Sequence, residues 1–313
     1  MIDYLSSNSV VAALAGIYLL LVVASVITLI LKKSKPEKNY TELQQRINSW
    51  WVMVSIFTVV MVSSKTISVV FFGFISFLAL KEYFSIIPTR RADRRVLFWA
   101  YLSIPVQYYW VAEAWYGLFI IFIPVYLFLL LPMRMVMIGE MRHFLRSAGT
   151  LHWGLMSLVF SISHVAYLLV LPSSESFAVG GAGLVLYLVF LTQFNDVCQY
   201  VWGKMLGKHK IIPKVSPNKT WEGFLGGVAT TSILGGALAG LLTPMSVPMG
   251  ILAGLIISVF GFVGDVTISA LKRDIGVKDS GSLLPGHGGI LDRIDSLTYT
   301  APLFFHYVYY FYF

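Results

Sequence analysis

Charged side chains that could handle a phosphate are concentrated in residues 269–295 of an otherwise strongly apolar chain. The segment contains the cations Lys272, Arg273 and Lys278, the carboxylates Asp274, Asp279, Asp292 and Asp295, and the turn His287-Gly288-Gly289. Glycines let backbone N–H groups approach a ligand closely, as they do in phosphate-binding loops. Cations, carboxylates and a glycine turn together therefore indicate a site for a nucleotide or phosphate bound with a metal ion.

The same segment fits a long gapped signature without a mismatch. The fixed positions of S-x2-K-R-x4-K-D-x-G-x2-L-P-x-H-G-G-x2-D-R-x-D are occupied by Ser269, Lys272-Arg273, Lys278-Asp279, Gly281, Leu284-Pro285, His287-Gly288-Gly289, Asp292-Arg293 and Asp295. In these residues the chain resembles the bacterial phosphatidate cytidylyltransferases, also called CDP-diacylglycerol synthases. The resemblance implies a polytopic membrane enzyme that condenses CTP with phosphatidate, giving CDP-diacylglycerol and pyrophosphate.

Two upstream segments extend this resemblance to about residues 195–297. The pattern S-P-x-K-T-x-E-G is matched in full by Ser216, Pro217, Lys219, Thr220, Glu222 and Gly223. The pattern D-x2-A-Y-x2-G-R is matched at Asp196, Tyr200 and Gly203, with Gln199 in place of Ala and Lys204 in place of Arg. Lysine keeps the positive charge at that last position but lacks the bidentate fork of arginine.

Asp265 is a carboxylate inside a predicted membrane helix, near the cytoplasmic end of that helix. Helical spacing places Asp265, Ser269 and Lys272 on one face. Intramembrane carboxylates are functional by default, although a plain Asp265–Lys272 ion pair is the alternative. Mg²⁺ sites combine one or two carboxylates with phosphate oxygens, and Asp292 would add a carboxylate from a second element. The resemblance implies that Asp265 and Asp292 bind Mg²⁺, and a second cation is left open.

A short helix is predicted to begin after His287-Gly288-Gly289, with Asp292 and Asp295 on one of its faces. Both carboxylates could simply be acids favoured near a helix N-terminus. The glycine turn could instead offer N–H groups to an anion. Upstream, Ser216-Pro217 is typical of an N-cap followed by proline at the first helical position. Such an N-terminus beside Lys219 could bind an anion, with plain capping as the alternative.

The predicted site residues fall into three groups. Catalytic roles are assigned to Lys272, Arg273, Lys278, Asp279, His287 and Arg293; substrate or CTP binding to Asp196, Ser216, Lys219, Ser269, Gly288, Gly289 and Asp295; and metal binding to Asp265 and Asp292. Phosphatidate carries its own nucleophilic phosphate oxygen, so we expect His287 to orient the loop or contact a phosphate, without acting as a base. Arg293 could clamp a phosphate with its planar fork, or pair with Asp274 or Asp279.

Composition predicts an all-α, polytopic integral membrane protein. The 313 residues are 57% apolar and only 12% charged, which excludes an ordinary soluble domain. At about 20 residues per span, the apolar runs predict about ten transmembrane helices, over residues 10–31, 50–63, 66–81, 96–112, 116–132, 150–171, 180–202, 221–242, 248–270 and 296–313. A single cysteine, Cys198, excludes an internal disulfide.

The net charge of +8 is explained by membrane topology. With the N-terminus outside, all but Lys65 of the 23 Lys and Arg residues fall in cytoplasmic loops or at their edges, which is the positive-inside asymmetry. The charge therefore does not require nucleic-acid binding. The first apolar run is expected to be a retained span, because it is too long for a signal peptide and is followed by Lys32-Lys33. Two short spans that turn at Ser63-Ser64-Lys65 keep the arginines of residues 90–95 on the cytoplasmic side. One long helix would place them outside, against the positive-inside rule.

We expect one membrane domain over residues 1–313, with apolar scaffold spans in residues 1–171 and a catalytic part in residues 172–313. Glycines multiply in the second part, where Gly223/Gly227 and Gly236/Gly240 form small-xxx-small pairs that allow close helix packing. The expected location is the bacterial cytoplasmic (inner) membrane, with the site on the cytoplasmic side. The expected partners are CTP, phosphatidate and the lipid bilayer, with no nucleic acid and with a homodimer left open.

Two other classes of function remain open from the sequence. One is a related lipid enzyme: a cytidylyltransferase for another lipid phosphate, or a CTP-dependent polyprenol or phytol kinase. The other is an ion-coupled transporter, in which Asp196 and Asp265 would be relays at membrane depth. Against transport, the polar residues gather at one membrane face and no inverted repeat is visible in the sequence.

Overall fold

The computed structural model describes residues 8–34, 37, 39–88, 94–172, 180–281 and 288–313. Within these ranges the chain is helical and forms no strand. The helices are α1 (Asn8–Ser34), α2 (Thr41–Val62), α3 (Lys65–Ile86), α4 (Arg94–Ala112), α5 (Tyr116–Ile121), α6 (Phe128–Ile138), α7 (Phe144–Gly154), α8 (Ser161–Val170), α9 (Gly180–Leu206), α10 (Trp221–Leu242), α11 (Val247–Asp274), α12 (Leu291–Ile294) and α13 (Leu297–Tyr312).

The predicted all-α membrane fold is confirmed. Short π-helical segments, Phe122–Leu127 and Leu155–Phe160, join α5 to α6 and α7 to α8 into two continuous helices, so each predicted span coincides with one helix. Seven of these are long and apolar enough to cross a membrane: α1, α3, α5–α6, α7–α8, α9, α10 and α11. The spans predicted at α2, α4 and α13 stay predictions, which keeps about ten spans as the expectation.

The second and third predicted spans form a hairpin with its turn at the predicted position, Ser63-Ser64-Lys65. Helix α2 ends at Val62 and α3 begins at Lys65. The Ser64 hydroxyl caps α3 by accepting the N–H of Ile67 at 3.4 Å. The helices themselves are longer than predicted, with 22 residues each. They extend through polar turns at their outer ends, which a search for apolar runs leaves out.

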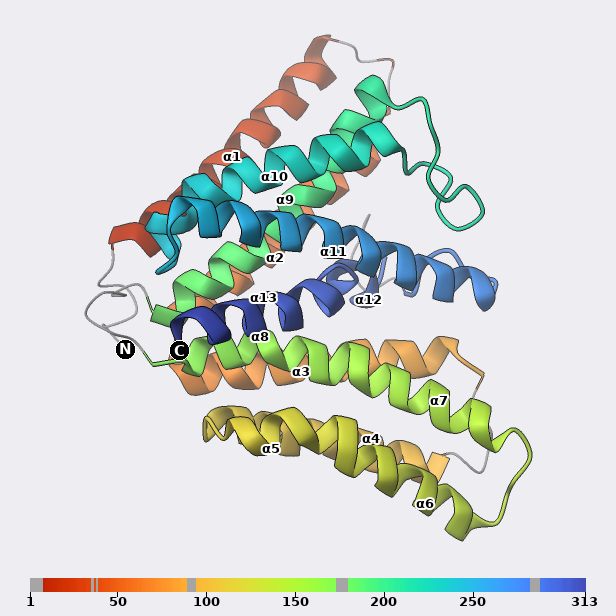
Figure 1. The fold of residues 1–313 in the computed structure, drawn as a ribbon. Helices are drawn as coiled ribbons and strands as arrows, with labels where there is room; N and C mark the ends of the chain where they lie inside the picture. The colour runs from red at the N-terminus through yellow and green to blue at the C-terminus, as the bar shows by residue number, and fades with distance from the viewer. Residues whose placement is uncertain (1–7, 35–36, 38, 89–93, 173–179, 282–287) are drawn as a thin grey trace.

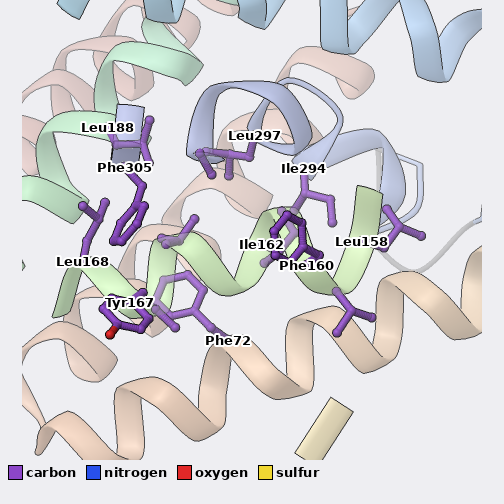
Figure 2. Close-up of a cluster of buried hydrophobic side chains, with 14 of the residues drawn as sticks. Phe72, Leu158, Phe160, Ile162, Tyr167, Leu168, Leu188, Ile294, Leu297 and Phe305 are labelled. Atoms are coloured by element: carbon purple, nitrogen blue, oxygen red, sulfur yellow. The ribbon is translucent and has the colours of Figure 1, made fainter. Parts of the chain in front are cut away.

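Helix α8 forms the centre of the bundle. It lies between α3 and α13 (Figure 1), and every residue from Ser161 to Leu169 is buried. Figure 2 shows apolar side chains from both neighbours converging on it, including Phe72 of α3 and Phe305 of α13. A helix that is covered on all sides is typical of the core of a membrane bundle. The predicted scaffold part and catalytic part are thus packed against each other through α8.

Three of the four predicted small-xxx-small glycines lie at close helix contacts. A Cβ on Gly223 would come within 2.6 Å of the Gln199 carbonyl oxygen, and one on Gly227 within 2.4 Å of the Gln199 Cγ. One on Gly236 would come within 2.6 Å of Ile251 of α11. The prediction is wrong for Gly240, whose Cβ would meet no atom within 4 Å. Helix α10 is therefore held close to α9 near its N-terminal end and to α11 farther along.

The elements that carry the predicted site gather at one end of the bundle. The loop of residues 207–220, the end of α11 and the short α12 all lie toward the right-hand side of Figure 1. The C-terminal end of α3 is at this end too, because Glu82 contacts the backbone at Ile290. Four elements from both parts of the chain thus meet there.

Candidate active site

A polar cavity of about 500 Å³ opens at this end of the bundle, between the end of α9, the loop 207–220 and α11. It is lined by Asp196, Gln199, Tyr200, Gly203, Lys204, Lys210, Ser216, Asn218, Lys219, Thr220, Phe224 and Asp265. The structure therefore brings both upstream sequence motifs and Asp265 to one cavity.

Lys219 is one of three lysines that line the cavity. Its Nζ atom lies 2.7 Å from Asp265 Oδ2 and donates to Gln199 Oε1 at 3.2 Å. Burial alone would lower the pKa of Lys219, but the charges of Asp265 and Asp196 outweigh it and raise the pKa above its ordinary value. Lys219 therefore stays protonated. The Gln199 side chain, which stands where the resembled family carries Ala, is one of its partners.

Three carboxylates from separate elements converge beside Lys219. Asp196 of α9 accepts the Ser296 hydroxyl at 3.1 Å, and Asp295 accepts the Ser296 N–H at 2.7 Å. Burial and the charges of Asp265 and Asp196 raise the pKa of Asp295 well above its ordinary value. The cluster is therefore crowded with negative charge, which further cations would stabilise.

Arg293 faces this same carboxylate cluster. Its positive charge lowers the pKa of Asp295, partly offsetting the burial that raises it. Its Nε–H is buried without a hydrogen-bond partner. In the described part of the chain Arg293 forms no salt bridge with Asp274 or Asp279. The sequence-based alternative that it pairs with one of these acids is therefore wrong, and its guanidinium keeps a donor for another partner.

Asp292 belongs to a second, closed cluster. Its Oδ1 atom lies 2.6 Å from Lys272 Nζ, while its Oδ2 atom accepts the backbone N–H groups of Ser280 and Gly289, each at 3.1 Å. Burial would raise the pKa of Asp292, but the charge and hydrogen bond of Lys272 and the two N–H groups lower it below its ordinary value. Asp292 is thus a fully hydrogen-bonded anion that ties α11 to the loop before α12.

Glu82 of α3 is a site residue that the sequence analysis missed. Its carboxylate accepts the N–H groups of Ile290 at 2.9 Å and Leu291 at 3.1 Å, and it also bonds the Ser280 hydroxyl. These N–H groups lie at the start of α12, where backbone N–H groups have no carbonyl partner within the helix. A lone Glu after a long apolar run is the only sequence signal that could have drawn attention to it.

The structure describes two residues of the predicted glycine turn, Gly288 and Gly289, and both lie against carboxylates of the protein itself. Gly288 has a φ of +77°, and a Cβ there would come within 2.4 Å of Asp292 Oδ2. A Cβ on Gly289 would collide with the Glu82 carboxylate. Only glycines permit both close approaches. The Gly289 N–H, which the sequence assigned to a ligand, is instead bonded to Asp292.

The predicted helix start at Ser216-Pro217 is wrong. Helix α10 begins at Trp221, and its N-cap is Thr220, whose hydroxyl accepts the Gly223 N–H at 3.2 Å. Residues before it form a tight turn, in which the Lys219 N–H bonds the Ser216 carbonyl oxygen at 3.3 Å. Threonine caps helices as serine does, and the turn is what projects Lys219 toward Asp265.

The plain alternative of an Asp265–Lys272 ion pair is also wrong. Lys272 reaches Asp292, and Asp265 is paired with Lys219. Of the three residues predicted to share one helix face, Asp265 and Ser269 do contact each other: the Ser269 hydroxyl donates to Asp265 at 3.3 Å.

Three predicted catalytic residues lie outside these clusters. Arg273, Lys278 and Asp279 are exposed at and beyond the end of α11. Arg273 donates from Nε to the Val215 carbonyl oxygen at 3.2 Å, which ties α11 to the loop 207–220. His287 lies outside the described residues, so its predicted role stays a prediction.

The carboxylates suit a hard divalent cation in their chemistry. Mg²⁺ takes carboxylate oxygens and completes its shell with water or phosphate, and a cation would relieve the repulsion among Asp196, Asp265 and Asp295. In the described part of the chain no three His, Cys, Asp or Glu side chains are arranged as a metal site. The predicted pair Asp265 and Asp292 stays a prediction, since each is engaged by its own lysine.

Fold and site together define a multi-pass membrane protein with a lysine–carboxylate cavity at one end of its bundle. The chain belongs to the Cytidylyltransferase family, whose profile matches residues 44–311. It is 45% identical over 298 residues to "Uncharacterized protein YnbB" of Escherichia coli (strain K12), covering 95% of this chain and 98% of that protein. The predicted resemblance to this family is thereby confirmed.

Two shorter matches carry a named activity. The chain is 46% identical over 125 residues to a phosphatidate cytidylyltransferase of Staphylococcus aureus (strain COL). It is 42% identical over 124 residues to that of Staphylococcus haemolyticus (strain JCSC1435). Each match covers 39% of this chain and 48% of the relative. The chain thus matches about half the length of these enzymes.

Proposed function

We propose that this protein is a phosphatidate cytidylyltransferase, which condenses CTP with phosphatidate to give CDP-diacylglycerol and pyrophosphate. The observation that carries the proposal is the cavity in which Lys219 meets Asp265 and Asp196, at one end of a membrane bundle. Both substrates are phosphate anions, and one of them is a lipid. Such a cavity suits them when a cation offsets its carboxylates, because Lys204, Lys210 and Lys219 also line it close to a bilayer. Membership of the Cytidylyltransferase family supports the same reaction class.

In this reaction a phosphate oxygen of phosphatidate attacks the α-phosphorus of CTP. The bond from that phosphorus to the oxygen bridging the β-phosphate breaks, and pyrophosphate leaves with the electron pair. The attacking oxygen is already ionised near neutral pH, so no side chain has to remove a proton. Lys219 stabilises the charge that develops on the phosphoryl oxygens. Lys272 holds Asp292 and the loop beside it. Our proposed role for Arg273 and Lys278, which are exposed, is to attract the β- and γ-phosphates.

Mg²⁺ is the cofactor that we propose for this site. When bound, it neutralises triphosphate charge and helps to align the in-line displacement. Asp265 and Asp292 are its proposed ligands. Asp196 and Asp295 are further carboxylates whose repulsion the same cation would relieve.

We place the site on the cytoplasmic side of a bacterial cytoplasmic membrane, where CTP is available. The one-sided distribution of Lys and Arg supports this topology. Single cysteines at Arg142, Lys210 and Gly281 in a Cys198→Ser background should resist an impermeant maleimide in intact cells, while cysteines at Glu113 and Ser246 should react. The reverse pattern would place the cavity outside and overturn this part of the proposal.

Position-specific labelling of CTP tests the reaction directly. Purified protein with phosphatidate, Mg²⁺ and CTP should place the α-phosphate label in lipid and release the γ label as pyrophosphate. Transfer of the γ label into lipid would instead identify a lipid kinase. No transfer to phosphatidate, with transfer to another lipid phosphate, would keep the reaction type and replace the acceptor. No transfer of either label to any lipid phosphate would refute the proposal.

A further inference from the structure

A second cavity lies between α1, α9 and α10 and is lined by apolar residues alone. It encloses about 270 Å³ and is lined by aliphatic and aromatic side chains of α1, α9 and α10. Gly16 and Leu20 of α1 form one wall; Phe190 of α9 and Leu234 of α10 lie on the other walls. We call this cavity the apolar groove. It shares no lining residue with the polar cavity.

Helix α1 leaves the groove open because it packs loosely on α9 and α10. It lies along the outer edge of the bundle (Figure 1), and its main contacts are with α2. A Cβ on Gly16 would meet no atom within 4 Å, so this wall is not filled by any side chain. Leu20 remains 54% exposed. The space is therefore accessible from the bilayer through the α1 side.

The groove and the polar cavity are joined by the same pair of helices. Phe190 in the groove and Asp196 in the polar cavity are six residues apart on α9, about 9 Å along the helix axis. Phe224 and Leu234 make the same connection on α10 over about 15 Å. One leaflet of the hydrocarbon core is also about 15 Å deep, half of the usual core thickness. A molecule with a phosphate in the polar cavity could therefore place an acyl chain in the groove.

We propose that the apolar groove binds one acyl chain of the lipid substrate while its phosphate occupies the polar cavity. The inference rests on the proposed function, because it names where the lipid part of that substrate is held. Lipid tails are as apolar as leucine, so entering the groove brings no hydrophobic gain over the bilayer. The contribution of the groove is orientation: a held chain fixes the phosphate relative to Lys219. The groove residues on α1 lie outside residues 44–311, the segment that the family profile matches.

Filling the groove tests this assignment. Gly16→Leu places a side chain in the open wall, and Gly240→Leu is the matched control, since a Cβ on Gly240 also meets no atom within 4 Å but Gly240 does not line the groove. For dipalmitoyl phosphatidate, Gly16→Leu should raise KM roughly tenfold, as expected for one obstructed apolar pocket. KM for CTP should not change. With dihexanoyl phosphatidate, whose chains are too short to reach the groove, Gly16→Leu, Gly240→Leu and the parent protein should behave alike.

Cross-linking provides a readout that does not depend on turnover. Phosphatidate with a diazirine near the end of one palmitoyl chain should label α1 around Gly16 and α10 around Leu234, and excess unlabelled phosphatidate should compete. Labelling of other helices, or equal effects of Gly16→Leu on both chain lengths, would overturn the groove assignment while the proposed reaction stands. A bifunctional reagent that cross-links two copies of the chain through α1 would show that the groove is a subunit contact and would also overturn it. If the parent protein has no activity on phosphatidate, the proposed function fails, and competed labelling in the groove would still identify a lipid site.

Discussion

Two lysine–carboxylate pairs lie in the C-terminal part of this chain, and they differ in their surroundings. Lys219 and Asp265 line an open cavity, with side chains 19% and 22% exposed. Lys272 and Asp292 are 13% and 7% exposed, and Asp292 has every side-chain oxygen bonded. The first pair sits beside Asp295, whose pKa is raised by burial and by the charges of Asp265 and Asp196, whereas Asp292 of the second pair is satisfied by Lys272 and backbone N–H groups.

The two pairs come from the same sequence motifs but differ in their expected roles: one binds a ligand and the other fixes a loop. The Lys219–Asp265 pair has negative charge available for a bound cation, because three carboxylates face one lysine and the Arg293 guanidinium. The closed pair fixes the loop that ends in the Gly288-Gly289 turn, together with Glu82 from α3. Residues of the same type and the same signature can therefore bind substrate or hold the binding site in place. Substitutions should separate the two tasks by their effects on stability and on activity.

The largest effect is expected at the closed pair. Asp292→Asn leaves the buried Lys272 without its counter-charge, which should reduce the free energy of unfolding by about 3–5 kcal/mol and abolish activity. Thermal unfolding in detergent and CTP-dependent lipid labelling would measure the two losses. The double variant Lys272→Met/Asp292→Asn removes both charges and should recover much of the stability without recovering activity. An unfolding temperature of Asp292→Asn equal to that of the parent would show that the pair does not anchor the loop.

At the open pair the expected loss is in activity alone. Asp265→Asn removes a proposed metal ligand and the partner of Lys219, and it also lowers the repulsion on Asp196 and Asp295. Activity should fall by about 10²–10³-fold, the usual effect of losing one electrostatic contact to a transition state, while the unfolding temperature stays near that of the parent. Asp274→Asn is the control, because Asp274 is exposed at the end of α11. Near-normal Mg²⁺-dependent turnover by Asp265→Asn would exclude an essential role.

A smaller effect is expected where the two parts of the chain meet. Glu82→Gln replaces a carboxylate oxygen with an NH₂ group, which would face a backbone N–H of α12 in place of accepting from it. One lost charge-assisted hydrogen bond should cost about 1.5–3 kcal/mol of stability. Activity should fall about tenfold at temperatures where the variant is folded, because the loop carrying Gly289 is misplaced. Lys81→Gln, at an exposed neighbour, is the control. If both variants matched the parent in activity, Glu82 would have no positioning role.

The sequence predicted the helices well because each one contains an apolar run long enough to cross a bilayer. It placed helix ends less well, since α2 begins in polar residues at Thr41 and α10 is capped by Thr220 after a turn that no periodicity marks. Local relations in the site were also readable, such as Ser269 one turn from Asp265. The contact of Glu82 with Ile290 was not, because it joins residues 208 positions apart through tertiary packing that leaves no local pattern.

The smallest effect is expected at the exposed cations beyond α11. Lys278 lies at the surface, and its side chain makes no salt bridge in the described part of the chain. Its charge can attract CTP only across solvent, where a single contact is worth about 0.2–1 kcal/mol. Lys278→Gln should therefore raise KM for CTP by no more than about fivefold and leave kcat and the unfolding temperature unchanged. The difference from the parent should shrink as salt is added, because ions screen exposed charges. Asp279→Asn, the neighbouring change of opposite sign, should leave KM unchanged or lower it slightly. A loss in kcat that persists at high salt would instead place Lys278 in contact with the reacting phosphates, and the division between an open and a closed cluster would then have to include this loop.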